Sequence, residues 1–172
     1  MTRAYVALGS NLGDREALLA SARAGLASTP GVALVAASQL YETEPVGSPQ
    51  GRYLNAVVAL DTSLTAPALL ARLHELERAA GRRRSAERNA ARTLDLDLLL
   101  FEAACIETPE LTLPHPRLHE RAFVLLPLSE IAADVVHPRL GLRIGVLAQR
   151  VRAASSVWPW PAAQAWPPLA GP

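Results

Sequence analysis

Apolar and polar positions along the chain follow two different periods, which predict two kinds of element. Short apolar stretches bounded by turn residues are typical of strands, and they occur at residues 3–8, 32–43, 53–63 and 91–101. Residues 66–81 instead carry leucines at helical spacing, with a proline near the start and a glycine at the end. Asp14 is a suitable N-cap for another helix, which we expect to end near residue 28.

The order of these elements predicts the fold class. Strand, helix, strand, strand, helix and strand follow one another, and further helices are expected over residues 123–132 and 142–154. This order favours a ferredoxin-like α+β fold, in which helices pack against one face of an antiparallel sheet. We expect a single domain that covers residues 1–154.

The last residues, 155–172, have a different composition. They hold five prolines and all three tryptophans, which excludes a regular helix or an inner strand. We expect a tail that is disordered or lies on the surface of the domain. A segment that docks onto a partner protein is the alternative.

Composition limits the class of protein. With 172 residues the chain suits one domain with a sizeable core, and a 50% hydrophobic content with 19% charged residues is typical of soluble proteins. No apolar run is long enough for a membrane span, and the first residues do not resemble a secretory signal. Because Cys105 is the only cysteine, the sequence excludes an internal disulfide and a cysteine-based zinc site. We expect a cytoplasmic protein.

The basic residues are of one type and are clustered in one part of the sequence. All 17 basic residues are arginines, so a Schiff-base lysine and a P-loop lysine are excluded. Six arginines crowd into residues 78–92, where Glu87 is the single acid. A solvated basic loop, or a loop that binds RNA, would explain such a segment. Because the segment lacks aromatic residues for base stacking, a nucleotide polyphosphate is the better match.

Two carboxylates follow this basic segment on a predicted strand. Side chains alternate between the faces of a strand, so Asp95 and Asp97 share one face and the neighbouring leucines share the other. A solvated sheet face would explain a short D-x-D pattern as well. Beside the arginines, however, oxygen ligands at this spacing suit Mg²⁺ bound to phosphates.

Two smaller groups are further candidates. Tyr53 and Asn55 share one strand face, where an aromatic ring beside an amide suits a flat heterocycle, although an ordinary half-buried face would look the same. His115 lies between two prolines with Arg121 nearby, which suits phosphate binding or a structural turn. His115 and His119 also have the spacing of a helical zinc pair, but an acidic partner at the matching spacing is missing.

Six segments in order resemble one known family. They read ALGSNLGDR, YETEPVG, QGRYLNAVVAL, LLARLHELERAAGRRR, RTLDLDLLLF and LPHPRLHERAFVLLPLSEIA. Together they resemble the 6-hydroxymethyl-7,8-dihydropterin pyrophosphokinases of folate biosynthesis, from about residue 4 to about residue 150. The resemblance implies a ferredoxin-like fold and transfer of the pyrophosphoryl group of ATP to the pterin hydroxymethyl group, releasing AMP. It also implies two Mg²⁺ ions.

The resemblance implies roles for single residues. The catalytic residues it implies are Arg82, Arg92, Asp95 and Asp97, of which the two aspartates hold the metal ions. The nucleotide-binding residues it implies are Glu77, Arg84, Arg88, His115 and Arg121. The pterin-binding residues it implies are Thr43, Val46, Tyr53, Asn55 and Phe123. We therefore expect a monomer that acts on small molecules, without nucleic acid or membrane as a partner.

The chain departs from the family pattern in its basic loop. Asn89 and Ala91 stand where the family usually has tryptophan and proline, and His74 replaces a familiar glutamine. We expect weaker retention of nucleotide or pterin rather than lost chemistry. A binding protein without catalytic activity is the alternative, and Asn89 and Ala91 are its sole support.

Overall fold

The computed structural model describes residues 1–45, 51–81, 93–161, 166, 167 and 169. Within these residues, six strands form the main sheet, namely β1 (Thr2–Ser10), β2 (Val32–Ala37), β3 (Tyr41–Thr43), β4 (Tyr53–Thr62), β5 (Asp95–Phe101) and β8 (Val157–Pro159). The helices are α1 (Arg15–Ala27), α2 (Ala66–Ala79), α3 (Ala122–Ala132) and α4 (Ile144–Arg152). Short elements lie between β5 and α3, namely β6 (Ile106–Glu107), β7 (Thr112–Leu113) and the 3-10 turn η1 (Leu118–Glu120).

The main sheet is antiparallel and has β1 and β4 at its centre. The strand order is β5-β1-β4-β3-β8, and β2 pairs with the other half of β4. Asp14 caps α1 as expected, since its side chain accepts a hydrogen bond from the Ala17 N–H at 3.1 Å. The antiparallel α+β fold expected from the order of elements is therefore confirmed.

The predicted strand at residues 32–43 is two strands in the structure. The chain leaves the ladder at residues 38–40, between β2 and β3. There the Ser38 side-chain oxygen accepts a hydrogen bond from the Val57 N–H at 3.0 Å, in place of a backbone carbonyl. Ser38 and Gln39 interrupt the apolar stretch at this point, but two polar residues between apolar ones do not by themselves indicate that a strand ends.

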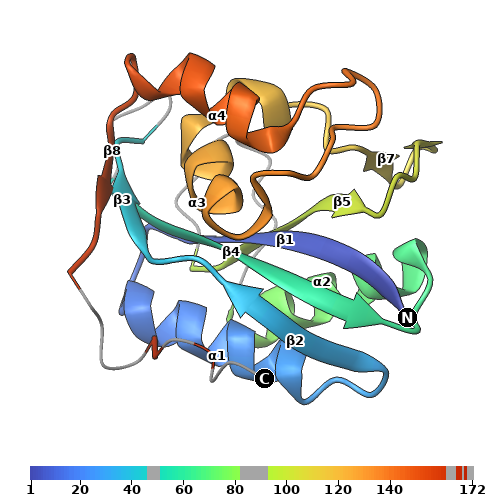
Figure 1. The fold of residues 1–172 in the computed structure, drawn as a ribbon. Coiled ribbons are helices and arrows are strands. Elements are labelled where there is room, and N and C mark those ends of the chain that lie inside the picture. Colours follow the sequence, from blue (N-terminus) through green and yellow to red (C-terminus); the bar gives the residue numbers. More distant parts are fainter. Residues whose placement is uncertain (46–50, 82–92, 162–165, 168, 170–172) are drawn as a thin grey trace.

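Helices cover both faces of the sheet, not one face as the sequence led us to expect. Helices α1 and α2 pack on one face, where the core includes Leu69 and Leu73 of α2 and Leu96 of β5. Helices α3 and α4 pack on the other, against Val57 of β4 and Leu99 of β5. Figure 1 shows the resulting three layers, with the sheet between the two helical layers.

The expected alternation of β5 holds over its first half. Leu94, Leu96 and Leu98 join the core beneath α1 and α2, so Asp95 and Asp97 face the α3 side. A register shift opposite Tyr5 then places Leu99 and Leu100 together in the α3 core. The strand thus changes from polar to apolar on the α3 side within three residues.

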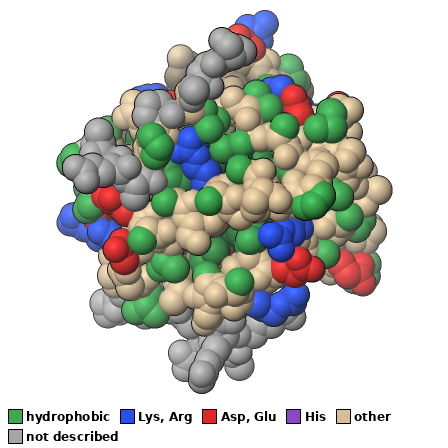
Figure 2. Space-filling view, turned by 90° about the horizontal axis from the view of Figure 1, so that it is seen from below, with side chains coloured by type: hydrophobic (Ala, Val, Ile, Leu, Met, Phe, Trp, Pro, Cys, Tyr) green, Lys and Arg blue, Asp and Glu red, His purple; other side chains and the backbone are tan. Residues whose placement is uncertain are grey.

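The last residues are joined to the sheet. Strand β8 pairs with β3 and forms an edge, and the Trp166 side chain is buried in the α1 core. Figure 2 looks at the molecule from the α1 side, where the basic and acidic side chains of the described residues lie in small groups. None of the helices in the described residues has the length and apolar character that a membrane span requires.

Candidate active site

A cavity of about 550 Å³ opens on the α3 side of the sheet, where β1, β3, β4 and β5 come together. Eight residues that the sequence singled out line it, namely Thr43, Tyr53, Asn55, Asp95, Asp97, His115, Arg121 and Phe123. These residues come from three strands, a loop and the start of α3, separated by up to 80 positions in the sequence. The fold therefore brings the aromatic candidates and the acidic candidates to one place.

The floor of the cavity is hollow because the central strand carries small side chains there. Tyr5, Ala7 and Gly9 follow one another on the α3 face of β1, and Ala7 and Gly9 line the cavity. Gly9 pairs with Asn55 on one side and with Asp95 on the other. A Cβ atom at Gly9 would lie 2.9 Å from the Asn55 Oδ1 atom. The sequence analysis missed Ala7 and Gly9, although their decreasing size along one strand face is visible in the sequence.

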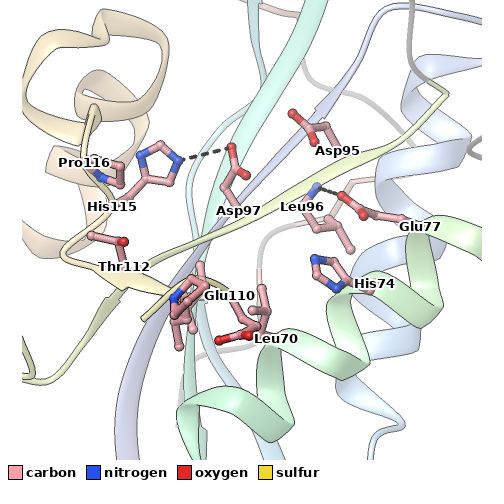
Figure 3. Close-up of a pocket in the computed structure, with 13 residues that line it drawn as sticks. Leu70, His74, Glu77, Asp95, Leu96, Asp97, Glu110, Thr112, His115 and Pro116 are labelled. Atoms are coloured by element: carbon pink, nitrogen blue, oxygen red, sulfur yellow. Dashed lines mark hydrogen bonds and ion pairs between the residues drawn. The ribbon is translucent and has the colours of Figure 1, made fainter. Parts of the chain in front are cut away.

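The two aspartates lie between this cavity and a second one. The second cavity, of about 310 Å³, is lined by Asp95 and Asp97 together with His74 and Glu77 of α2. Figure 3 shows His115 on one side of the aspartates, and His74 and Glu77 on the other. A ligand that occupies both cavities would therefore pass over the carboxylates.

Glu77 has a structural contact in addition to its place at the second cavity. Its side chain is buried, and its Oε1 atom accepts a hydrogen bond from the Leu96 N–H at 2.8 Å. Leu96 lies between the two aspartates on β5, the outermost strand on that side of the sheet. The contact therefore holds α2 to the strand that carries both carboxylates.

Positively charged and neutral donors face Asp97. The Arg121 Nη1 atom and the His115 Nε2 atom each lie 4.0 Å from its Oδ2 atom. Burial, followed by the charge of Arg121, lowers the pKa of His115 to about 4, so the imidazole is neutral at pH 7. Its Nδ1 atom accepts a hydrogen bond from the Arg117 N–H at 3.2 Å, which leaves the proton on Nε2, beside Asp97.

A buried hydrogen bond orders the aromatic end of the cavity. The Asn55 Nδ2 atom donates to the Thr43 hydroxyl at 2.9 Å, and this contact fixes the orientation of the amide. Tyr53 on β4 and Phe123 on α3 line the same cavity from two different layers. The guanidinium carbon of Arg121 lies 5.6 Å from the centre of the Phe123 ring. Arg121 thus contacts both the aromatic end and the acidic end.

The remaining candidates lie outside the residues that the structure describes. They are Val46, Arg82, Arg84, Arg88 and Arg92, together with the unusual loop residues Asn89 and Ala91. The cavity also has lining residues that the sequence analysis missed. Among these, Arg117 and Glu120 come from the turn around η1, and Ala154, Ser155, Ser156 and Val157 precede or begin β8.

Comparisons with known proteins agree on one family. Residues 5–133 match the model of the family described as 7,8-dihydro-6-hydroxymethylpterin-pyrophosphokinase. A protein of Methylorubrum extorquens named 2-amino-4-hydroxy-6-hydroxymethyldihydropteridine pyrophosphokinase is 50% identical over 137 residues, which cover 79% of this chain and 86% of that protein. The Bacillus subtilis protein of the same name is 47% identical over 133 residues, covering 77% of this chain and 79% of that protein.

Solved structures show the same fold. A crystal structure of a Plasmodium falciparum HPPK-DHPS chain superposes with a TM-score of 0.66 at 14% sequence identity. The match covers 89% of this chain but only 44% of that longer chain, so it supports the fold alone. The family model and the two bacterial relatives show which family the chain belongs to. The chain belongs to the 7,8-dihydro-6-hydroxymethylpterin-pyrophosphokinase family and is an enzyme of the pyrophosphokinase type.

Proposed function

We propose that this enzyme transfers the pyrophosphoryl group of ATP to the hydroxymethyl group of 6-hydroxymethyl-7,8-dihydropterin, and that the residues described above carry out the reaction. The main support is that an aromatic pair and an oriented amide lie next to two carboxylates in the same cavity. A flat heterocycle and a polyphosphate need these two kinds of surroundings, and the reaction requires them to be adjacent.

The aromatic end is the proposed pterin site. Tyr53 and Phe123 offer ring faces on which the pterin stacks. Asn55 and Thr43 meet its hydrogen-bonding edge, and the Asn55–Thr43 hydrogen bond sets the amide in one orientation before the pterin arrives. The backbone of Val46, outside the described residues, is proposed to add a contact to the same edge.

The acidic pair is the proposed metal site. Among the described residues no group of three histidine, cysteine or acidic side chains could hold a metal ion, and the chain offers the two carboxylates of Asp95 and Asp97. This donor set fits Mg²⁺, which commonly takes one or two carboxylates and completes its shell with water and substrate phosphates. Two ions are proposed, and they would neutralise the phosphates and align them for transfer.

The cationic residues are proposed to bind the phosphates of ATP. His115 presents a neutral N–H and Arg121 presents a guanidinium on the same side of Asp97. Glu77, at the second cavity, is the proposed contact on the nucleoside side. Arg84 and Arg88 are proposed to bind the nucleotide, while Arg82 and Arg92 stabilise the charge of the transferring group.

The transfer itself is a displacement at phosphorus. The hydroxymethyl oxygen forms a bond to the β-phosphorus of ATP, and the bond from that phosphorus to the oxygen bridging to the α-phosphorus breaks. AMP leaves with this oxygen, and the hydroxyl proton is released. The protein contributes orientation and charge neutralisation, which account for most of the acceleration in transfers of this kind. We propose that the enzyme acts as a cytoplasmic monomer.

Product analysis tests the proposal. The purified chain is mixed with Mg²⁺, ATP and the pterin, and AMP and ADP are separated and quantified. AMP formed only in the presence of pterin is the expected result, and ADP would indicate an ordinary phosphotransferase instead. Tight binding of both ligands without turnover would favour the binding-protein alternative.

A further inference from the structure

The three tryptophans of the chain all lie after residue 157, and each one stacks on an arginine. Trp158 covers the Arg52 guanidinium at 5.1 Å, Trp160 covers Arg15 at 5.1 Å, and Trp166 covers Arg23 at 4.9 Å, measured from the guanidinium carbon to the ring centre. Arg15 and Arg23 belong to α1, and Arg52 directly precedes β4. We call the described residues 154–161, 166 and 167 the C-terminal strap.

Hydrogen bonds attach the strap to β3 and its neighbours. Val157, Trp158 and Pro159 pair with Thr43, Glu42 and Tyr41 of β3. Beyond the ladder, the Glu44 N–H donates to the Ser156 carbonyl at 3.3 Å, and the Trp160 N–H donates to the Leu40 carbonyl at 2.8 Å. The strap therefore adds an outer strand beside the short strand that carries Thr43.

The two faces of β8 meet different surroundings. Side chains alternate along a strand, so Val157 shares the cavity face with Thr43, whereas Trp158 shares the opposite face with Glu42. On the cavity side, Ala154, Ser155, Ser156 and Val157 form part of the cavity wall. On the opposite side, Trp158 covers the guanidinium that ion-pairs with Glu42 and Glu44.

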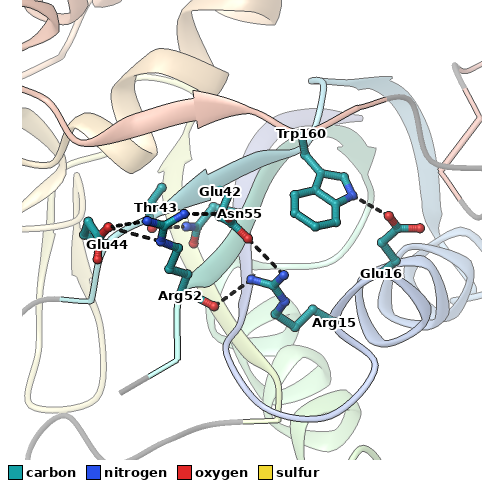
Figure 4. Close-up of polar contacts among 8 residues, drawn as sticks. All are labelled: Arg15, Glu16, Glu42, Thr43, Glu44, Arg52, Asn55 and Trp160. Atoms are coloured by element: carbon teal, nitrogen blue, oxygen red, sulfur yellow. Dashed lines mark hydrogen bonds and ion pairs between the residues drawn. The ribbon is translucent and has the colours of Figure 1, made fainter. Parts of the chain in front are cut away.

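A network of charged side chains connects the Trp158–Arg52 contact with α1. The Glu42 carboxylate forms ion pairs with Arg15 at 3.0 Å and with Arg52 at 3.1 Å. Arg15 also donates to the Arg52 carbonyl at 2.8 Å, and Glu16 accepts a hydrogen bond from the Trp160 indole N–H. Figure 4 shows Arg52, Glu42 and Glu44 close to Thr43 and Asn55, the pair that orients the proposed pterin site, with the Trp160–Glu16 pair further along towards α1.

We propose that residues 154–157, at the start of the C-terminal strap, form one wall of the pterin pocket, and that Trp158, acting through Arg52 and β3, is a positioning residue for the pterin. The proposal rests on the proposed function and adds to it a segment that lies beyond the family match at residues 5–133. Trp158 is 44% exposed, so it contributes little to the core. Its contact instead fixes Arg52 and Glu44, which lie at the two ends of the connection between β3 and β4.

The test compares two tryptophans of the same strap. Trp158→Ala removes the anchor beside the cavity. Trp166→Ala is the matched control, because Trp166 is buried in the α1 core and its indole N–H donates to the Ser38 carbonyl at 2.9 Å. Dissociation constants for the pterin and for ATP, with kcat and the melting temperature, are measured for wild type and both variants. Trp158→Phe keeps a ring over Arg52 and serves as the rescue.

The expected results separate positioning from general stability. Trp158→Ala raises the Kd of the pterin about threefold, as expected for loss of one exposed cation–π contact, with the Kd of ATP and kcat unchanged. Trp158→Phe restores most of the affinity. Trp166→Ala lowers the melting temperature more than Trp158→Ala does, and leaves the pterin Kd at the wild-type value.

Three results would overturn the inference. The first is a folded Trp158→Ala variant with unchanged pterin affinity. The second is an equal loss of affinity in Trp158→Ala and Trp166→Ala, which would show a general effect of stability. The third is a wild-type chain that binds no pterin, and this result alone would also overturn the proposed function.

Discussion

The two faces of the central sheet use the same strands for different purposes. On the α1 side, alternate residues of β1, β4 and β5 are Val, Leu or Ala, and they form a continuous core. On the α3 side the same strands start apolar, with Tyr5, Val57 and Leu99, and turn small or polar at Gly9, Asn55 and Asp95. The change occurs within one or two positions of the same face on each strand.

The difference shows how little is needed to make a site on a sheet. The antiparallel register brings Gly9 between Asn55 and Asp95, so one residue without a side chain leaves room beside an amide and a carboxylate. The opposite face keeps its leucines and holds the strands in place. Substitutions at the small and polar positions of the α3 side should therefore change activity, and substitutions of the leucines on the α1 side should change stability.

Removing a carboxylate is expected to have the largest effect. Asp95→Ala or Asp97→Ala should lower the rate of AMP formation by at least about a thousandfold, because phosphoryl transfer depends on charge neutralisation. The melting temperature should stay close to wild type, since the Asp97 carboxylate is about one-third exposed. Rates of AMP formation under saturating substrates measure the effect. Retention of a tenth of the activity by both variants would exclude the proposed metal site.

A leucine on the opposite face is expected to show the reverse behaviour. Leu60 of β4 is fully buried on the α1 side, so Leu60→Ala should reduce the free energy of unfolding by about 2–5 kcal/mol. Below the melting temperature its pterin affinity should equal that of wild type. Urea unfolding and equilibrium binding together measure both quantities. A tenfold loss of affinity in folded Leu60→Ala would contradict the division between the two faces.

A single methyl group on the cavity floor should affect binding selectively. Gly9→Ala would place a Cβ atom 2.9 Å from the Asn55 Oδ1 atom, so the amide must move and its hydrogen bond to Thr43 weakens. We expect the pterin Kd to rise about tenfold, which corresponds to loss of about one buried hydrogen bond. Gly145→Ala on α4 is the control, because its Cβ would meet Ala133 in the α3–α4 layer. Equal pterin affinities for Gly9→Ala and Gly145→Ala would contradict the role of Gly9 in the cavity floor.

Acid should weaken the polar edge of the α1 side by a small amount. Burial raises the pKa of Glu42, but hydrogen bonds from Arg15 and Arg52 outweigh it and leave the pKa below its usual range. The contribution of Glu42 to stability is therefore present above the unfolded pKa near 4.5 and is lost as the pH falls through the lower folded value. Glu42→Gln should cost no more than about 1 kcal/mol at pH 7 and flatten the acid dependence of unfolding. The urea midpoints of wild type and Glu42→Gln are measured between pH 3 and 7. The same acid dependence in both proteins would contradict the prediction.

Local sequence patterns predicted what depends on neighbours in the chain. The Asp14 cap and the alternation of Asp95, Leu96 and Asp97 need only local geometry, and the structure contains both. The face chosen by α3 was not predictable in this way. Val124, Leu125, Leu126, Pro127 and Leu128 are all buried. The polar residues of the helix, Ser129 and Glu130, lie together near its end, so the pattern does not mark one continuous polar face.

Long-range pairing accounts for most of what the sequence did not reveal. Strand β8 has three residues, two of which are Trp158 and Pro159, and its register depends on β3, more than a hundred positions earlier. The cavity also depends on long-range contacts. The sequence indicates which side chains are chemically suitable, but not that residues 154–157 form part of the cavity wall. The resemblance to a family supplied the remaining site residues by position, and the roles of all the site residues stay predictions.

The position of the tryptophans gives the protein an optical signal of its own. Indole emission can come only from Trp158, Trp160 and Trp166, because they are the three tryptophans of the chain. Their fluorescence therefore reports the attachment of the strap, whereas far-ultraviolet circular dichroism follows the helices of both layers. If the indole signal changes at a lower denaturant concentration than the circular dichroism, the strap detaches as a separate unit before the domain unfolds.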